Sequence, residues 1–109
     1  MTDISYEDFK KIDMRIVKVI KAEQIPNKTK ILKLIIDVGS GETRTLIAGG
    51  AEYYSSEYFT GKKFVALLNL TPRKIAGVDS QGMLLAADTG CKPLWLITDG
   101  DAPVGAKIT

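Results

Sequence analysis

The segment from Ile31 to Val38 carries the strictest pattern in the chain, because its apolar residues occur at alternate positions. These are Leu32, Leu34, Ile36 and Val38. Successive side chains of a β-strand point to opposite faces of a sheet, so a period of two predicts a strand with one buried face. Gly39-Ser40-Gly41 follows as a hairpin connection, and Thr43 to Ala48 forms a partner strand. The chain is therefore expected to build a sheet with a covered face.

Further runs of strand character lie on either side of this hairpin. They are Met14 to Glu23, Lys63 to Leu70, Met83 to Ala87 and a short sixth run from Leu94 to Thr98. The first run changes parity along its length, which predicts a bulge or a sharp bend of the kind that barrels need. Ser56 to Phe59 is expected to form a short helix before the fourth strand. Five principal strands with a helical insert between the third and fourth match an all-β OB-fold barrel.

Two short aromatic segments are expected to cover this barrel. Ser5-Tyr6-Glu7-Asp8 fits a capping box, with Ser5 as N-cap and Asp8 reaching back, and predicts a helix of about two turns. Such a helix is too short to stand alone and must pack on the domain or on a partner. The aromatic residues of the helical insert are expected to plug one end of the core. These are Tyr53, Tyr54, Tyr58 and Phe59.

The connection from Thr71 to Gly82 is the most unusual segment of the chain. It is too long and too polar for a hairpin turn, and we interpret it as a loop between two strands. Pro72 stiffens the backbone in front of Arg73 and Lys74, so their cations are expected to project. In an OB-fold, the loops after strands 1 and 4 and the face of strands 2 and 3 bind oligonucleotides or oligosaccharides.

Basic residues occupy both of these loops. Lys28 and Lys30 fall in the first loop, Gln24 to Lys30, whereas Arg73 and Lys74 fall in the second. Lys33 is expected on the outward face of the second strand, and Arg44 lies in the third. Neither of these two strands contains an aromatic residue, which disfavours a general binder of single strands. The pattern instead suits phosphates, sugars and a few splayed bases in a folded RNA.

The amino-acid composition excludes several classes of function. A chain of 109 residues suits one domain, 1–109, and its net charge of +2 does not by itself imply nucleic acid. Histidine is absent and Cys91 is the only cysteine, which excludes a Cys/His zinc site and Ser-His or Cys-His catalysis. We therefore expect no enzyme activity, no cofactor and no metal. Without a membrane-spanning run or signal-peptide core, the expected location is the cytoplasm.

Several segments resemble the tRNA-binding domain family, over roughly residues 9–109. They are Asp13-Met14-Arg15-Ile16-Val17, Pro26-Asn27-Lys28-Thr29-Lys30-Ile31, Asp37-Val38-Gly39, Asn69-Leu70-Thr71-Pro72-Arg73-Lys74 and Gly77-Val78-Asp79-Ser80-Gln81-Gly82-Met83. The family includes stand-alone dimeric tRNA-binding proteins and the C-terminal domain of many methionyl-tRNA synthetases. It also includes the domain similar to endothelial monocyte-activating polypeptide. The resemblance implies an OB-fold that recognises tRNA by shape, without catalysis.

Together with the basic loops, the resemblance gives a set of candidate tRNA-binding residues. The set is Asn27, Lys28, Lys30, Lys33, Arg73, Lys74, Ser80, Gln81 and Met83. Many members of the family carry a basic residue where this chain has Thr71 or Ala76, which predicts weaker attraction for phosphates.

Several candidates also have a purely structural interpretation. Asn27 is a good turn residue after Pro26, and Ser80 and Gln81 could close the loop through hydrogen bonds to backbone. Met83 could belong to the core, and Trp95 is more typical of a core or an interface than of a stacking platform. The sequence leaves these alternatives open.

Three further expectations concern partners. The chain acts alone or as an accessory module of an aminoacyl-tRNA synthetase, with tRNA as its ligand. The alternative is a peptide-binding chaperone that assists secretion, because one branch of the family has that role. A homodimer is also expected, because the N-terminal helix and the extension after Ala87 carry apolar residues that a small barrel cannot cover.

Overall fold

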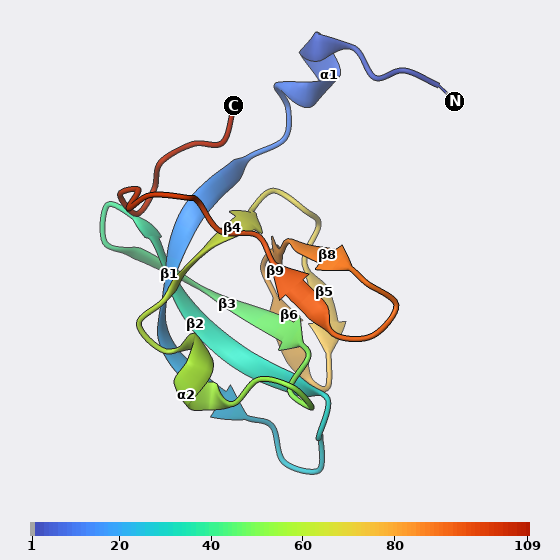
Figure 1. The fold of residues 1–109 in the computed structure, drawn as a ribbon, viewed down its shortest axis with the longest axis vertical. Helices are drawn as coiled ribbons and strands as arrows, with labels where there is room; N and C mark the ends of the chain where they lie inside the picture. The colour runs from blue at the N-terminus through green and yellow to red at the C-terminus, as the bar shows by residue number, and fades with distance from the viewer. Residues whose placement is uncertain (1) are drawn as a thin grey trace.

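Five antiparallel strands wrap around one core in the computed structural model, which describes residues 2–109 (Figure 1). Their order in the sheet is β3-β2-β1-β4-β7. The bounds are β1 Met14–Gln24, β2 Ile31–Gly39, β3 Glu42–Gly49, β4 Lys63–Leu67 and β7 Met83–Leu84. This arrangement confirms the all-β barrel of OB type. The alternating residues of β2 are all buried, as predicted.

The first strand bends in order to serve two neighbours. The first half of β1 pairs with β4 and its second half pairs with β2. The register of the pairing with β2 shifts between Val19 and Lys21. The strand thus contains a bulge, but it lies further along than the parity change between Ile16 and Val17 from which it was predicted, where the pairing with β4 is regular. Ile16 is buried as well as Val17, although neighbouring side chains point to opposite faces. The C-terminal segment lies beside this half of β1, where the Ile16 N–H donates to the Ala106 carbonyl at 2.9 Å.

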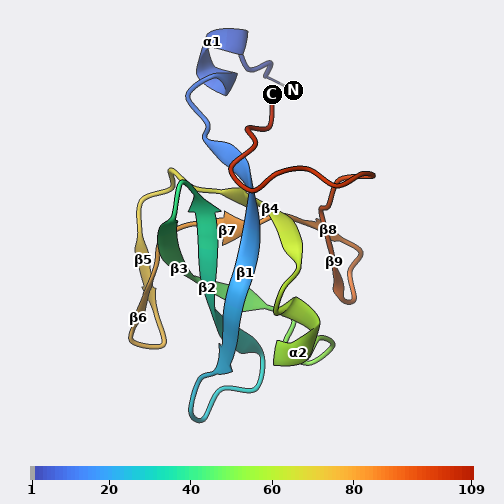
Figure 2. The ribbon, with the colours of Figure 1, turned by 90° about the vertical axis from the view of Figure 1, so that its left-hand side faces the viewer.

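Two single-turn helices are attached to the barrel, α1 Tyr6–Phe9 and α2 Ser56–Phe59. Ser5 caps α1 as predicted, because its hydroxyl accepts a hydrogen bond from the Asp8 N–H at 3.1 Å. The reciprocal half of the capping box is wrong, since the Asp8 carboxylate accepts from Lys11 instead. The α-helix covers one turn only, and the Lys11 and Ile12 N–H groups continue it with hydrogen bonds to the carbonyls three residues earlier. Figures 1 and 2 show α1 standing away from the barrel beside the C-terminus.

Aromatic side chains close the end of the barrel that carries α2. Phe59 is fully buried, and its ring centroid lies 5.4 Å from that of Tyr58 and 5.5 Å from that of Trp95. Tyr54 packs against the same cluster. The predicted plug is thus confirmed for these residues, and Trp95 belongs to it. Tyr53 is an exception, because half of its surface is exposed.

The last part of the chain follows the sequence prediction less closely. The predicted strand from Met83 to Ala87 is divided between β7 and β8 Ala86–Asp88, and β8 pairs with β9 Pro93–Trp95. Residues 105–108 then run along β1 (Figure 2). The ion pair of Lys63 and Asp101, 2.8 Å, anchors the intervening loop, and the hydrogen bond from Lys63 lowers the pKa of the Asp101 carboxyl. Within residues 2–109, no helix has the length and apolar character needed to cross a membrane.

Candidate nucleic-acid interface

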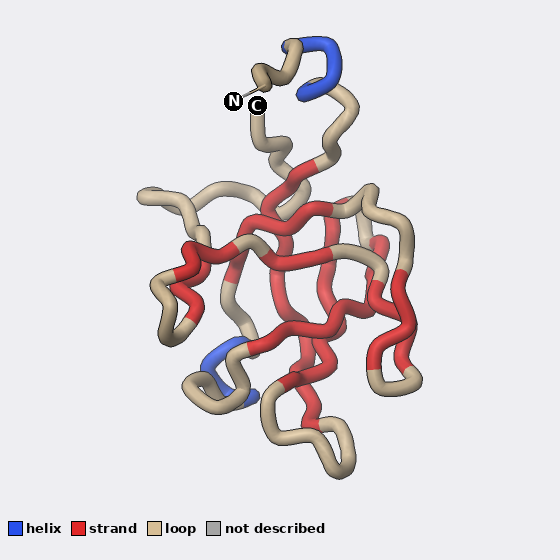
Figure 3. The backbone as a smooth tube through the Cα atoms, turned by 90° about the vertical axis from the view of Figure 1, so that its right-hand side faces the viewer, coloured by secondary structure: helices blue, strands red, loops and turns tan. Residues whose placement is uncertain are grey.

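The connection between β4 and β7 is a hairpin of its own. β5 Arg73–Ile75 pairs with β6 Val78–Ser80 in an antiparallel ribbon on the outside of the barrel (Figures 2 and 3). Ala76 and Gly77 connect the strands with φ angles of 52° and 79°. Two residues with positive φ form the tight turn whose twist suits a hairpin. The prediction of an irregular loop is therefore wrong. The hairpin could not be recognised from the sequence, because its two short, half-polar strands give almost no hydrophobic pattern.

This hairpin sends its two basic side chains in opposite directions. Arg73 lies opposite Ser80, and Lys74 lies opposite Asp79. Directly paired residues share one face of an antiparallel ribbon, and successive residues alternate between faces. Arg73 therefore shares the barrel-facing side with Ile75 and Ser80, whereas Lys74 points away from them. The two cations, adjacent in sequence, therefore lie on opposite faces of the hairpin.

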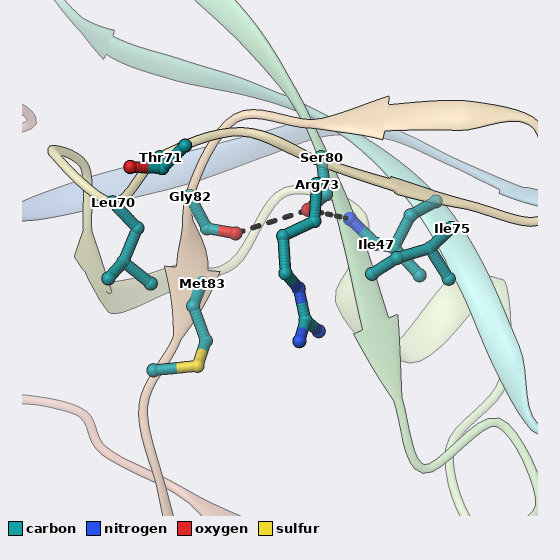
Figure 4. Close-up of a pocket in the computed structure, with 8 residues that line it drawn as sticks. All are labelled: Ile47, Leu70, Thr71, Arg73, Ile75, Ser80, Gly82 and Met83. Carbon is teal, nitrogen blue, oxygen red and sulfur yellow. Dashed lines mark hydrogen bonds between the residues drawn. The ribbon is translucent and has the colours of Figure 1, made fainter.

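Ser80 and Gln81 close the barrel between β3 and β7. The Ser80 hydroxyl accepts a hydrogen bond from the Ile47 N–H at 3.0 Å and donates to the Gly82 carbonyl at 3.1 Å (Figure 4). The Gln81 N–H donates to the Thr45 carbonyl at 2.8 Å, and the Gln81 side-chain oxygen accepts from the Thr45 N–H. These hydrogen bonds thus take the place of the regular backbone pairing that is missing between β3 and β7. The structure supplies the loop-closing partners that the sequence left as an alternative.

A pocket of about 390 Å³ lies between this closure and the hairpin (Figure 4). Its lining is Ile47, Leu70, Thr71, Arg73, Ile75, Ser80, Gly82 and Met83. Leu70 and Met83 are both 44% exposed, so Met83 is not a core residue. Ile47, Leu70 and Ile75 are not recognisable as site residues from the sequence. Their pattern reads as ordinary strand, and only the folded hairpin places them around one cavity.

The loop after β1 is organised by a turn at Pro26 and Asn27. The Lys28 N–H donates to the Ile25 carbonyl at 3.0 Å, and Asn27 has a φ of 65°. A proline followed by a residue with positive φ is typical of a type II turn, in which asparagine is favoured. The turn thus accounts for the Asn27 backbone. Its side chain is exposed, as are Lys28 and Lys30.

Lys33 and Arg44 occupy different environments. Lys33 is half-buried on the outer face of β2, opposite Ile47 of β3, and therefore beside the pocket. Arg44 donates to the Leu68 carbonyl at 2.6 Å and lies 3.8 Å from Glu42. Arg44 therefore holds the end of the barrel together. It is not part of the basic surface.

The basic face is the surface formed by Lys28, Lys30, Lys33, Arg73 and Lys74. Six ion pairs connect other residues in the described range 2–109, and none involves these five cations. In Figures 2 and 3 the β1–β2 loop and the tip of the β5–β6 hairpin point to the same end of the barrel. Residues 2–109 contain no group of three or more side chains suited to hold a metal ion. The arrangement is suited to electrostatic binding of an extended anion.

Comparison with known proteins identifies this architecture. The family model described as "Putative tRNA binding domain" matches residues 14–107. The chain belongs to this tRNA-binding domain family. A methionine–tRNA ligase of Thermotoga maritima is 48% identical over 106 residues, which are 97% of this chain. That of Pyrococcus furiosus is 44% identical over 108 residues. The chain spans only 17% and 15% of the lengths of these relatives.

Two solved structures show how far the tRNA-binding domain fold extends. A MetRS-related protein from Pyrococcus horikoshii has a TM-score of 0.90 and 40% sequence identity, and the match covers 100% of both chains. A chaperone CsaA from Bacillus anthracis has a TM-score of 0.88 and 28% identity, and covers 99% of this chain and 100% of its own. The fold of this chain therefore matches both of these structures over nearly its whole length.

Proposed function

We propose that this domain binds tRNA without catalysing a reaction, and that it recognises the shape and charge of the folded RNA. The observation that carries the proposal is the basic face, whose five cations have no ion-pair partner among residues 2–109. Lysine and arginine neutralise phosphates and release counterions, which supplies affinity without reading sequence. Residues 1–109 act as one domain in this proposal, and a tRNA ligand implies the cytoplasm.

The candidate residues divide into two roles in this proposal. Lys28, Lys30 and Lys74 contact phosphates, and the exposed Asn27 amide offers a hydrogen bond near the same loop. Ser80 and Gln81 act indirectly, because their side chains already bind the backbone of β3 and keep the hairpin in place. Arg73, Lys33 and Met83 surround the pocket.

The first prediction is that tRNA binding weakens steeply with salt. Each phosphate contact contributes roughly 0.7 to 0.9 to the slope of log affinity against log salt. Replacing Lys74 with alanine should weaken binding of different tRNAs about equally and lower that slope by about one. Filter binding or fluorescence anisotropy across a salt series measures both quantities. Lys92→Ala, on the other side of the barrel, is the control. An affinity that does not depend on salt would rule out this mechanism.

The working context of the domain is also a proposal. Curated relatives at 48% and 44% identity are methionine–tRNA ligases, several times longer than this chain. We therefore infer that the domain assists an aminoacyl-tRNA synthetase by holding its tRNA. The peptide-binding alternative has the weaker support, because the chaperone structure is only 28% identical. Binding of an extended peptide in the absence of tRNA binding would reverse this preference.

A homodimer is the second part of the partner proposal. Ile4 is 75% exposed and Tyr6 is 70% exposed. Tyr6 begins α1, which stands away from the barrel, and Ile4 lies just before it (Figure 2). A groove next to them is lined by Phe9, Ile12 and Ile108, among others. A two-fold axis through this region would bury the groove of one copy against the helix of the other. Two basic faces on one particle would then act on a single tRNA.

The prediction is that the chain sediments as a dimer at micromolar concentration and that Tyr6→Glu shifts it to a monomer. The change removes the apolar Tyr6 ring and places in the interface a carboxylate that must lose its hydration, a cost that Lys10, 5.4 Å from the Tyr6 ring centroid, offsets only in part. Truncation is a poorer test, since residues 96–108 hydrogen-bond to β1 and β4. Tyr53→Glu is the matched control, because Tyr53 is also an exposed tyrosine but lies far from α1. A wild-type monomer that still binds tRNA would contradict the dimer.

A further inference from the structure

Phosphate binding explains the cations of the basic face but not the apolar pocket between them. Leu70 and Met83 each expose 44% of their surface at this position, and Ile47 and Ile75 form the wall opposite them (Figure 4). Exposed apolar groups gathered in a cavity, in the middle of a charged surface, are typical of a binding site. The pocket volume of about 390 Å³ falls within the range of small-ligand sites.

The Arg73 side chain crosses this pocket. Figure 4 shows its guanidinium extending between Met83 and the two isoleucines. No hydrogen bond or ion pair engages it within residues 2–109. A guanidinium is planar and weakly hydrated, so it stacks on flat rings as well as binding phosphates. Unstacked RNA bases are held on aromatic side chains or on arginine planes, and this face offers arginine only.

The surroundings of the pocket favour a nucleotide over an apolar peptide side chain. Lys33 lies opposite Ile47 in the sheet, at the edge of the cavity, and Arg73 lies within it. Each nucleotide carries a base with apolar faces and a phosphate, and the sugar joins the two. This combination matches an apolar cavity with cations at its rim. An apolar side chain of a peptide would bring no negative charge to these cations.

We propose that the pocket receives one unstacked nucleobase from an unpaired part of the tRNA. The base inserts between the Arg73 guanidinium and the Leu70–Met83 wall, and Lys33 meets the adjoining phosphate. This inference rests on the proposed tRNA binding and gives it a specific contact. It also assigns Leu70 a role in binding that a purely electrostatic surface would not require.

The test combines a pocket variant with altered RNA. The double variant Leu70→Ala/Met83→Ala lowers the affinity for an intact tRNA transcript about tenfold, which corresponds to about 1.4 kcal/mol. The salt slope stays unchanged, because no charge is removed. Transcripts with one abasic nucleotide at each unpaired position are then measured in turn. At one position, removal of the base lowers the affinity for the wild-type protein about tenfold. The same removal does not lower the affinity for the double variant any further.

Leu94→Ala is the matched control, since Leu94 is also a leucine, 45% exposed, and lies on β9 away from the pocket. The single variant Leu70→Ala provides a second measurement if the double variant is poorly folded. A scan with no abasic position costing more than about twofold, while intact tRNA still binds, overturns the inference and leaves tRNA binding intact. An apolar peptide that binds wild-type protein but not the variant assigns the pocket to peptide and also overturns it. If the wild-type chain does not bind tRNA at all, both proposals are overturned.

Discussion

Replacing Gly82 with alanine is expected to destabilise the protein by at least about 3 kcal/mol. Gly82 has a φ of +149°, and an added Cβ would lie 2.7 Å from the Leu67 carbonyl oxygen and 3.0 Å from Leu46. The contact with Leu67 is to backbone, in the strand that pairs with β7, so it cannot be relieved by a rotamer change. Relief requires movement of the β3–β7 closure made by Ser80 and Gln81. Urea denaturation and thermal unfolding measure the loss, which should lower Tm by about 10 °C or more.

Gly41→Ala separates crowding from backbone strain. Gly41 also has a positive φ, +76°, but an added Cβ would meet nothing within 4 Å. Its replacement should cost about 1 kcal/mol, the strain of the conformation alone. If Gly82→Ala costs no more than Gly41→Ala, the barrel closure adapts easily and Gly82 has no special packing role.

The largest effect on binding is expected from the combined variant Lys28→Ala/Lys30→Ala/Lys33→Ala. Each lost phosphate contact lowers affinity about four- to fivefold near physiological salt, so three together should cost about 100-fold. The slope of log affinity against log salt should fall by about two to three units. Lys28 and Lys30 are exposed and Lys33 is half-buried on the outer face, so the fold should be preserved. Anisotropy with folded tRNA at several salt concentrations provides the measurement.

A control with the same change in net charge is Lys10→Ala/Lys11→Ala/Lys107→Ala. These lysines belong to the α1 end of the molecule, opposite the β1–β2 loop (Figure 2). Two of them already pair with Glu7 and Asp8. We expect this control to lose less than about threefold. Equal losses in the two triple variants would show that net charge alone drives binding and that the basic face has no special position.

The barrel and its basic loops could be predicted from the amino-acid sequence. The strand from Ile31 to Val38 could be predicted because alternation records directly which side chains face the core. The short helix from Ser56 to Phe59 was also predictable, since Gly61 ends it and its aromatic residues need cover. The positions of Lys28, Lys30, Arg73 and Lys74 in two connections followed from the order of the strands. These are local properties that each segment carries without its neighbours.

The assembly of the site depends on contacts between segments that lie far apart in the chain, so it became visible only in the folded protein. The β5–β6 hairpin was invisible in the sequence, because its few residues have no clear period and its stability comes from packing on β3. The opposite directions of Arg73 and Lys74 depend on that hairpin, and so does the pocket between Ile47, Leu70 and Met83. Ser80 is buried because its hydroxyl replaces a missing strand contact to Ile47. Such roles depend on which backbone groups lack a partner after folding, and the order of residues does not record this.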